Sequence, residues 1–422
     1  MNISFRSRAS AWRFNSLQQG IAVNLGVRPS VSPLQIIIYC GLLLSVSAFS
    51  VDILLPAFGL MAGDLDADYA AIQMAVPVFL AFIGIGQLFT GPMSDRFGRR
   101  PVLLCGLAAF AAGTVLCLFA QSAEMLLLGR AVQGIGASGG PVVARALLRD
   151  LFSGRQLAAN IALATMVFAF GPIVAPLAGV AFMQFGSWRM IFAAILLFGL
   201  ILLAVGLLFL PETLARANPG ATRPAVLLAN AITVLRNPQS RFYGLLLGPV
   251  MSLMMLILIS IPRIYKDTFG IEGALFAALF AIHGIGIIIG QYFNRAMIHR
   301  HGPQFALLAG GVIAVGSVAL MLAFLFAGVL NAYVLSFTMI LFATSFMTMA
   351  ANCMALSLDP HGVIAGFVSS FVESMSRLFS AVFSGFLALL VGGRLDHFLY
   401  ALALTTLAVL GLILAGQRRM SA

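Results

Sequence analysis

The chain has 422 residues, of which 61% are hydrophobic and 9% charged, and its formal net charge is +11 at pH 7. Soluble domains carry roughly 25% charged residues, so this composition cannot cover a core of this size with a polar surface. It excludes an ordinary soluble protein and predicts an integral membrane protein. We expect no nucleic-acid partner, because the basic residues of membrane proteins gather in cytoplasmic loops beside anionic lipid.

The first 33 residues are basic and contain no acidic residue. We expect a solvated cytoplasmic tail here, and the alternative is a transit-like signal. The apolar run that follows is too long for a signal peptide, and further runs come after it. The four cysteines are scattered in apolar segments without the spacing of a metal site. They are interpreted as packing residues, and neither a metal nor another cofactor is expected.

A helix that crosses a bilayer needs about 20 apolar residues. The sequence contains twelve such runs: 34–60, 69–92, 101–121, 124–145, 157–183, 188–211, 241–265, 273–297, 304–328, 331–357, 361–391 and 394–415. The longest connection, 212–240, contains prolines, arginines and a weak amphipathic pattern. The prediction is an all-α polytopic membrane protein with a six-helix bundle at 34–211, a cytoplasmic linker at 212–240, a second bundle at 241–415 and a tail at 416–422.

The distribution of basic residues predicts the orientation. If the N-terminus lies in the cytoplasm, most of the 24 lysine and arginine residues fall on that side. The opposite side receives only Arg189, Arg263, Lys266 and Arg394. Arg130 and Arg377 fall inside helices. This bias predicts that both termini are cytoplasmic.

The two halves contain a repeat. A shift of 204 residues aligns "GQLFTGPMSDRFG" with "GQYFNRAMIHRHG", so that Gly86 meets Gly290 and Gly98 meets Gly302. Asp95 meets His299. Both stretches follow the second apolar run of their half, which predicts two copies of one six-helix unit in parallel topology.

Three motifs in the first half resemble the major facilitator superfamily. "GPMSDRFGRRPVL" is similar to its helix 2–3 signature, "LLLGRAVQGIGASGGPVVARALLRD" to its helix 4 motif, and "FGPIVAPLAG" to its helix 5 antiporter motif. Together with "VDILLPA", they resemble the bicyclomycin-resistance (Bcr/CflA) branch of drug exporters. The resemblance is dense over residues 50–180 and weak in the second half. It implies proton-driven efflux across the bacterial inner membrane.

The helix 2–3 loop concentrates charge in an otherwise apolar region. Asp95 can pair with a nearby arginine or with a helix N-terminus, and Gly98 permits a tight turn. By resemblance, the loop is a latch that closes and releases the cytoplasmic side; the alternative is that its arginines only enforce topology. The candidate gate residues are Gly91, Asp95, Arg96, Gly98, Arg99, Arg100 and Arg149.

Charges inside the bilayer are costly, about 2.5–3.5 kcal/mol each on insertion scales. Asp52 and Arg130 lie at comparable depth in the first half and could form a pair across a central cavity. Glu373 and Arg377 are four residues apart on one helix face. Because a neighbouring arginine changes the proton affinity of a carboxyl, all four are candidates for proton coupling and substrate binding. A fixed structural ion pair is the alternative for each couple.

Helix 5 contains four candidate antiporter-motif residues, Gly171, Pro172, Pro176 and Gly179. The prolines loosen the helix and the glycines permit close approach, which suits an interface between the halves; a lipid-facing kink is the alternative. "GIGASG" at 134–139 matches a dinucleotide fingerprint in letters, but it lies inside an apolar helix without a preceding strand. It is interpreted as a helix-packing stripe.

We expect a monomeric, proton-coupled exporter of small amphipathic molecules that works by alternating access. By resemblance, helices 1, 4, 5, 7, 8, 10 and 11 line its cavity. Phe346, Met347, Met349 and Met354 in helix 10 are candidates for adaptable contacts, and core packing is the alternative for them. An importer or uniporter on the same fold is the first alternative. An intramembrane enzyme is less favoured, because HExxH does not occur and no histidines cluster within an apolar run. A receptor or channel lacks a soluble domain or a ring of charge to support it.

Overall fold

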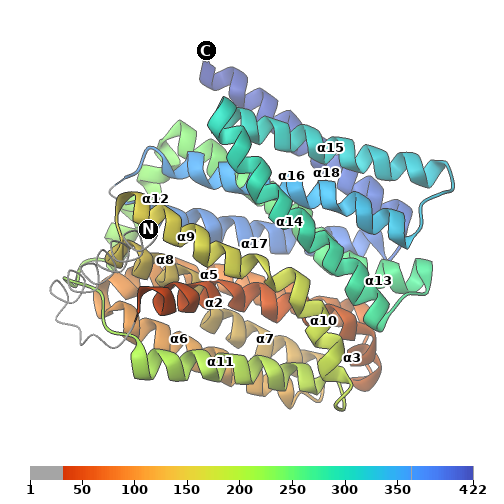
Figure 1. The fold of residues 1–422 in the computed structure, drawn as a ribbon, viewed down its shortest axis with the longest axis horizontal. Helices are drawn as coiled ribbons and strands as arrows, with labels where there is room; N and C mark the ends of the chain where they lie inside the picture. Colours follow the sequence, from red (N-terminus) through yellow and green to blue (C-terminus); the bar gives the residue numbers. More distant parts are fainter. Residues whose placement is uncertain (1–31, 363, 422) are drawn as a thin grey trace, which may run out of the picture.

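The computed structural model describes residues 32–362 and 364–421, and the tail predicted at 1–33 therefore lies almost wholly outside the described residues. The described chain is helical throughout (Figure 1). The first half contains α2 (Pro33–Asp52), η1 (Leu55–Ala57), α3 (Phe58–Asp64), α4 (Tyr69–Gln73), α5 (Ala75–Phe97), α6 (Arg99–Leu118), α7 (Ala123–Ala137), α8 (Gly139–Leu151), α9 (Gly154–Ala169), α10 (Gly171–Met183) and α11 (Arg189–Phe209). The second half contains α13 (Pro238–Phe269), α14 (Gly273–His301), α15 (Pro303–Phe326), α16 (Ala332–Leu358), α17 (Ala365–Val391) and α18 (Leu395–Ser421).

The predicted spans agree with the helices. Within the described residues, 11 helices are long and apolar enough to cross a membrane. The fourth predicted span, 124–145, is formed by α7 and α8, which have 15 and 13 residues and meet at Ser138. Neither is long enough alone, so the two helices cross together.

Prolines explain two further interruptions. α2 ends at Asp52 because Pro56 has no N–H to donate to the carbonyl of residue 52, and the chain continues through a turn and η1 into α3. The fifth span divides at Phe170 because Pro172 has no N–H for the carbonyl of residue 168. The boundaries predicted from hydropathy alone did not show either break.

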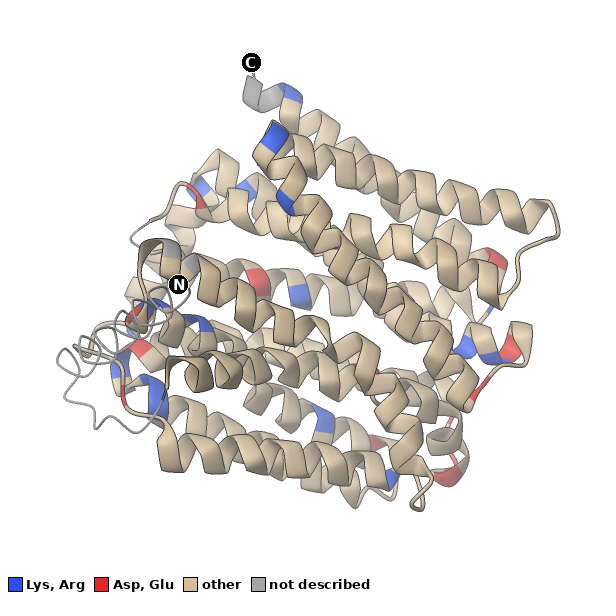
Figure 2. Ribbon diagram, viewed as in Figure 1, with Lys and Arg blue, Asp and Glu red and all other residues tan. Residues whose placement is uncertain are grey.

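The two halves lie side by side in Figure 1, with the red-to-light-green helices of the first half below the teal-to-blue helices of the second. They pack closely along two seams, α5 against α17 and α10 against α14. α9 contacts α14 only slightly. In Figure 1 these two helices separate toward the end that carries most of the arginines in Figure 2, which we call the arginine-rich end.

The loops aligned by the repeat have the same backbone conformation. Gly98 precedes α6 with φ 105° and ψ 152°, and Gly302 precedes α15 with φ 85° and ψ 170°. Both values lie where only glycine is comfortable, so the repeat explains both glycines. Between the halves, the segment predicted as a linker contains a short helix, α12 (Pro224–Arg236), which packs against α13 and α17.

Candidate functional site

A cavity of about 610 Å³ lies between the two halves. The first half contributes α2, α5, α8, α9 and α10 to its wall, and the second half contributes α13, α14, α16 and α17. Most of the wall is apolar, with five methionines: Met251, Met254, Met255, Met347 and Met354. Four charged side chains share the wall: Asp52, Arg145, Glu373 and Arg377. The cavity therefore combines an adaptable apolar surface with a few charges.

All seven spans that the resemblance places around the cavity contribute to its wall. The second span, α5, also contributes, although it was not expected to. Phe346, Met347 and Met354 lie in the wall as expected. The expectation for Met349 is wrong, because this side chain is fully buried against Gly310 on α15. Methionine spacing in the sequence did not distinguish the cavity face of α16 from its packed face.

Glu373 on α17 joins the basic residues of the cavity. Its Oε2 accepts a hydrogen bond from Nη2 of Arg145 on α8 at 2.6 Å, and its Oε1 accepts one from Nη2 of Arg377 at 2.7 Å. Only 12% of the Glu373 side chain is exposed. The Glu373–Arg377 pair matches the predicted i,i+4 spacing. The Arg145–Glu373 pair connects the two halves of the molecule.

Arg145 is a site residue that sequence reasoning missed. Its position near the end of a predicted span assigned it to the arginines that set topology. No local pattern indicated that α8 brings it to α17, since the two residues are 228 positions apart. One signal was present: Arg145 precedes the end of α8 by almost two turns, which places it within the helix.

Asp52 is the last residue of α2 and is only 4% exposed. Its side chain faces the cavity. Within the described part of the chain, its carboxyl group forms neither a salt bridge nor a hydrogen bond. Asp52 is therefore the cavity carboxyl without a basic partner, whereas Glu373 has two.

Arg130 does not pair with Asp52, so the predicted ion pair between them is wrong. The Arg130 side chain is fully buried on α7, its Nε donates to the backbone oxygen of Ala75 at 3.0 Å, and its Nη1 donates to Gln133. The guanidinium carbon lies 3.9 Å from the centre of the Phe79 ring. The sequence predicted correctly that Arg130 lies inside a helix, but it did not show the direction of the side chain. Arg130 fastens α7 to α5 and lies outside the cavity wall.

The glycines around Arg130 explain this enclosure. A Cβ atom on Gly134 would lie 2.4 Å from the backbone oxygen of Phe79 on α5. A Cβ atom on Gly136 would lie 2.2 Å from the backbone nitrogen of Phe110 on α6. The "GIGASG" stretch therefore allows α7 to contact two helices at backbone distance, which confirms its interpretation as a packing stripe.

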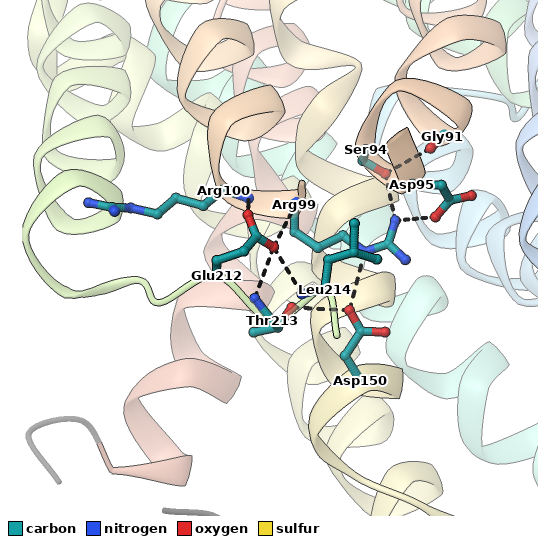
Figure 3. A network of polar contacts seen from close by, with 9 residues as sticks. All are labelled: Gly91, Ser94, Asp95, Arg99, Arg100, Asp150, Glu212, Thr213 and Leu214. Atoms are coloured by element: carbon teal, nitrogen blue, oxygen red, sulfur yellow. Dashed lines mark hydrogen bonds and ion pairs between the residues drawn. The ribbon is translucent and has the colours of Figure 1, made fainter. Parts of the chain in front are cut away.

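The predicted helix 2–3 loop is reduced to Gly98, and the residues on either side of this α5–α6 junction form a polar network (Figure 3). Arg99 forms an ion pair with Asp95, donates from Nη1 to Ser94 Oγ at 2.7 Å and donates from Nε to Asp150 Oδ2 at 3.2 Å. Thr213 Oγ1 also donates to Asp150, at 3.0 Å. Asp95 thus pairs with one of the predicted arginines, and this pair lies within the first half.

Glu212 is a second residue that sequence reasoning missed. Its carboxylate accepts hydrogen bonds from the backbone N–H groups of Arg99 at 2.9 Å and Arg100 at 3.1 Å, at the start of α6 (Figure 3). A carboxylate is favourable at a helix N-terminus because the first N–H groups have no helical partner. A Cβ atom on Gly98 would lie 2.4 Å from Glu212 Oε2, so the glycine also leaves room for this cap.

The other gate candidates lie around this network. Arg96 donates to Thr222, and Arg100 donates to the backbone oxygen of Leu207 at 2.7 Å. Two candidates contact the second half. The Nη2 atom of Arg149 lies 3.3 Å from the Cβ position of Gly366, and the Cβ position of Gly91 lies 3.3 Å from Ser370 Oγ. Gly91 and Arg149 thus lie close to α17, whereas the ion pairs of Asp95 and Arg99 join residues of the first half.

The four antiporter-motif residues are all in α10. A Cβ atom on Gly179 would lie 2.2 Å from the backbone oxygen of Ile53, whereas one on Gly171 would have its nearest neighbour at 3.7 Å. Pro172 lines the cavity, and Pro176 lies buried within α10. Because α10 packs against both α2 and α14, this motif lies at the seam between the halves.

The charged groups of the cavity do not form a metal site. Among the described residues, no group of three or more histidine, cysteine, aspartate and glutamate side chains could hold a metal ion. Two groups of long apolar helices around a shared cavity with buried charges are the architecture that secondary transporters have. The motif content agrees with this class.

A family model described as the Major Facilitator Superfamily matches residues 40–383, so the chain belongs to this superfamily. The chain is 31% identical over 254 residues to the uncharacterized MFS-type transporter YdgK of Bacillus subtilis, covering 60% of the chain and 63% of that protein. It is 28% identical over 268 residues to the bicyclomycin resistance protein homolog of Haemophilus influenzae, covering 64% and 67%. It is 38% identical over 183 residues to multidrug resistance protein D of Escherichia coli, covering 43% and 44%.

The aligned part thus spans about two thirds or less of each relative. Among solved structures, the human organic anion transporter MFSD10 (TETRAN) superposes with a TM-score of 0.65 at 19% identity, covering 89% of this chain and 98% of that one. This likeness shows the fold alone. The resemblance inferred from the sequence motifs is confirmed by the family match and the bacterial relatives.

Proposed function

We propose that this protein exports small amphipathic molecules in exchange for protons, by alternating access of the cavity between its halves. The observation that carries the proposal is a cavity with an adaptable methionine-rich wall and one unpartnered carboxyl, Asp52. The names of the bacterial relatives, which include bicyclomycin and multidrug resistance proteins, support efflux of drug-like molecules. A transport function is favoured over an enzymatic one.

Asp52 is the stronger candidate for the proton-binding group. A charge inside the membrane costs about 2.5–3.5 kcal/mol unless a partner or a proton neutralises it. Glu373 is neutralised by Arg145 and Arg377, whereas among the described residues no basic side chain pairs with Asp52. When the halves close around Asp52 and expel water, its charge has to be neutralised by a proton or a bound substrate. Alternation between these two occupants gives exchange.

The geometry suits movement of the halves against each other. Gly179 holds α10 against the turn after α2, so a displacement of α10 along α14 is transmitted to the backbone beside Asp52. We propose that the units 34–211 and 241–415 move as rigid bodies, with 212–240 as the connection. The gate residues Gly91 and Arg149 contact α17 at the arginine-rich end, where this movement makes or breaks closure.

The arginine bias supports a cytoplasmic location for both termini and for the linker. With the bacterial relatives, it favours the inner membrane. We propose that the transport unit is a monomer, since the cavity is formed within one chain. The gate network of the α5–α6 loop then lies on the cytoplasmic side.

Transport in vesicles tests the proposal. Drug susceptibility of cells with and without the gene identifies a substrate, and purified protein is then assayed with an imposed pH gradient. The Asp52→Asn variant is expected to lose accumulation against a gradient while it retains downhill exchange. Asp66→Asn is a matched control, because Asp66 is an exposed acid that does not line the cavity. Accumulation by Asp52→Asn at the unsubstituted rate would transfer the assignment to Glu373.

The same assay separates the alternatives. A uniporter equilibrates its substrate whatever the pH gradient, and an importer accumulates substrate in the direction of proton flow. The Arg130→Ala variant tests a structural role of this residue. Because Arg130 holds α7 to α5, this variant is expected to lose folding stability and not specifically coupling.

A further inference from the structure

Basic residues gather at both ends of the molecule (Figure 2), and the ends differ in how these residues are paired. At the end opposite the arginine-rich one, every basic side chain has an acidic partner. The four pairs are Arg189–Asp64, Arg263–Asp267, Lys266–Glu272 and Arg394–Asp396. The basic charges of this end are therefore neutralised by acidic partners.

In the linker region, at the arginine-rich end, the basic residues are not neutralised in this way. Arg216, Arg223, Arg236 and Arg241 are all exposed, and among the described residues none forms a salt bridge with an acidic side chain. Glu212, the acidic residue of this segment, is occupied by the backbone N–H groups at the start of α6. Four unpaired cations therefore surround α12, with Arg223 immediately before the helix and Arg236 at its end.

α12 carries more apolar surface than the protein covers. One face packs against α13 and α17, where Val234 is 1% exposed. A neighbouring strip contains Leu228, Ile232 and Leu235, spaced i, i+4 and i+7, and these side chains are 62%, 38% and 43% exposed. The spacing places them on one side of the helix. Thr233, also exposed, lies on a different side.

We propose that α12 lies in the membrane interface, with the strip Leu228–Ile232–Leu235 in the acyl boundary and the surrounding arginines bound to the phosphate groups of anionic phospholipids. An apolar strip bordered by arginines is the pattern of a helix that lies on a bilayer. Charge complementarity selects anionic lipid over a neutral surface. The position of α12 in the chain agrees with this location, because a single residue, Asn237, separates α12 from the membrane-spanning α13.

The contact has a consequence for the opening of the protein. Leu227 and Asn230 of α12 line a second cavity, of about 420 Å³, together with Asp95 of α5 and Gly366 of α17. Anionic lipid that holds α12 in the interface thereby fixes one wall of this cavity. The lipid acts on α12 whichever solute the central cavity carries.

Tryptophan fluorescence of the full-length protein in vesicles tests the proposal. Leu228→Trp places a probe in the strip, and Thr233→Trp is the matched control on another side of α12. The signal of the two native tryptophans is measured in the unsubstituted protein and subtracted. Vesicles contain dibrominated phosphatidylcholine or, at the same mole fraction, dibrominated phosphatidylglycerol, because bromine quenches only tryptophans that contact the acyl chains.

The expected result is quenching of Leu228→Trp and not of Thr233→Trp, with stronger quenching by phosphatidylglycerol. Each arginine near the membrane surface increases the preference for anionic over neutral lipid about fivefold. Changing Arg223, Arg236 and Arg241 together to Gln is therefore expected to remove the phosphatidylglycerol preference while quenching by phosphatidylcholine remains. Equal quenching at positions 228 and 233 would overturn the interfacial position. A preference that survives the triple change, or disulfide cross-linking between copies through Leu228→Cys, would overturn lipid as the partner.

Discussion

Removal of the Arg145 side-chain charge is expected to change the balance between the conformations of the transporter. Arg145→Gln deletes the ion pair that joins α8 to α17, yet Glu373 keeps its bond to Arg377 at 2.7 Å. No buried carboxylate is left without a partner, so the change reports on the connection between the halves. Arg377→Gln is the matched control, because it removes an equally short bond that lies within α17.

The magnitude follows from the exposure of the pair. A hydrogen bond to a charged group contributes about 1.5–3 kcal/mol when it is shielded from water. The Arg145 side chain is 35% exposed, which reduces the contribution to about 1–2 kcal/mol. A loss of this size changes a two-state population ratio by roughly 5- to 30-fold. The conformation with the halves joined through Glu373 is expected to become less populated by that factor.

Distances between spin labels on α9 and α14 measure this population. Leu163 and Tyr292 are suitable label positions, since their side chains are 45% and 64% exposed. Cys105 is exposed and is replaced by alanine first, whereas the other three cysteines are buried. An unchanged distance distribution in Arg145→Gln would refute the reasoning, as would an equal shift in Arg377→Gln.

Three further substitutions give expected outcomes. Gly179→Ala is expected to destabilise the protein by about 1–3 kcal/mol, because its Cβ would lie 2.2 Å from the Ile53 backbone oxygen, whereas Gly171→Ala meets nothing closer than 3.7 Å and leaves the melting temperature nearly unchanged. Gly98 has φ 105°, which alanine rarely adopts, so Gly98→Ala is expected to reduce the free energy of unfolding by a similar amount. Equal melting temperatures of variant and parent would contradict the capping geometry. Asp95→Asn is expected to insert into the membrane and to keep the melting temperature of the parent, because the Asp95 side chain is 48% exposed. It is expected to transport slowly in vesicles, and normal turnover would leave this region only a topological role.

Much of the architecture could be predicted from the sequence because it depends on local chemistry. Hydropathy over about 20 residues located the spans, since a helix has to match the thickness of the bilayer whatever its neighbours are. The 204-residue repeat identified Gly98 and Gly302 as equivalent, and both have positive φ. The i,i+4 spacing of Glu373 and Arg377 gave their contact directly, because a helix alone places them on one face.

The direction of side chains toward the cavity was decided only by the tertiary structure. The sequence predicts comparable depth for Asp52 and Arg130, but depth in the membrane does not determine the face of a helix, and the close packing of α7 turns Arg130 toward Ala75. Arg145 and Glu373 meet although they are 228 residues apart, and Glu212 caps a helix that begins 113 residues earlier. Span length is imposed by the bilayer on each helix separately, whereas these contacts depend on how helices from both halves rotate and pack together.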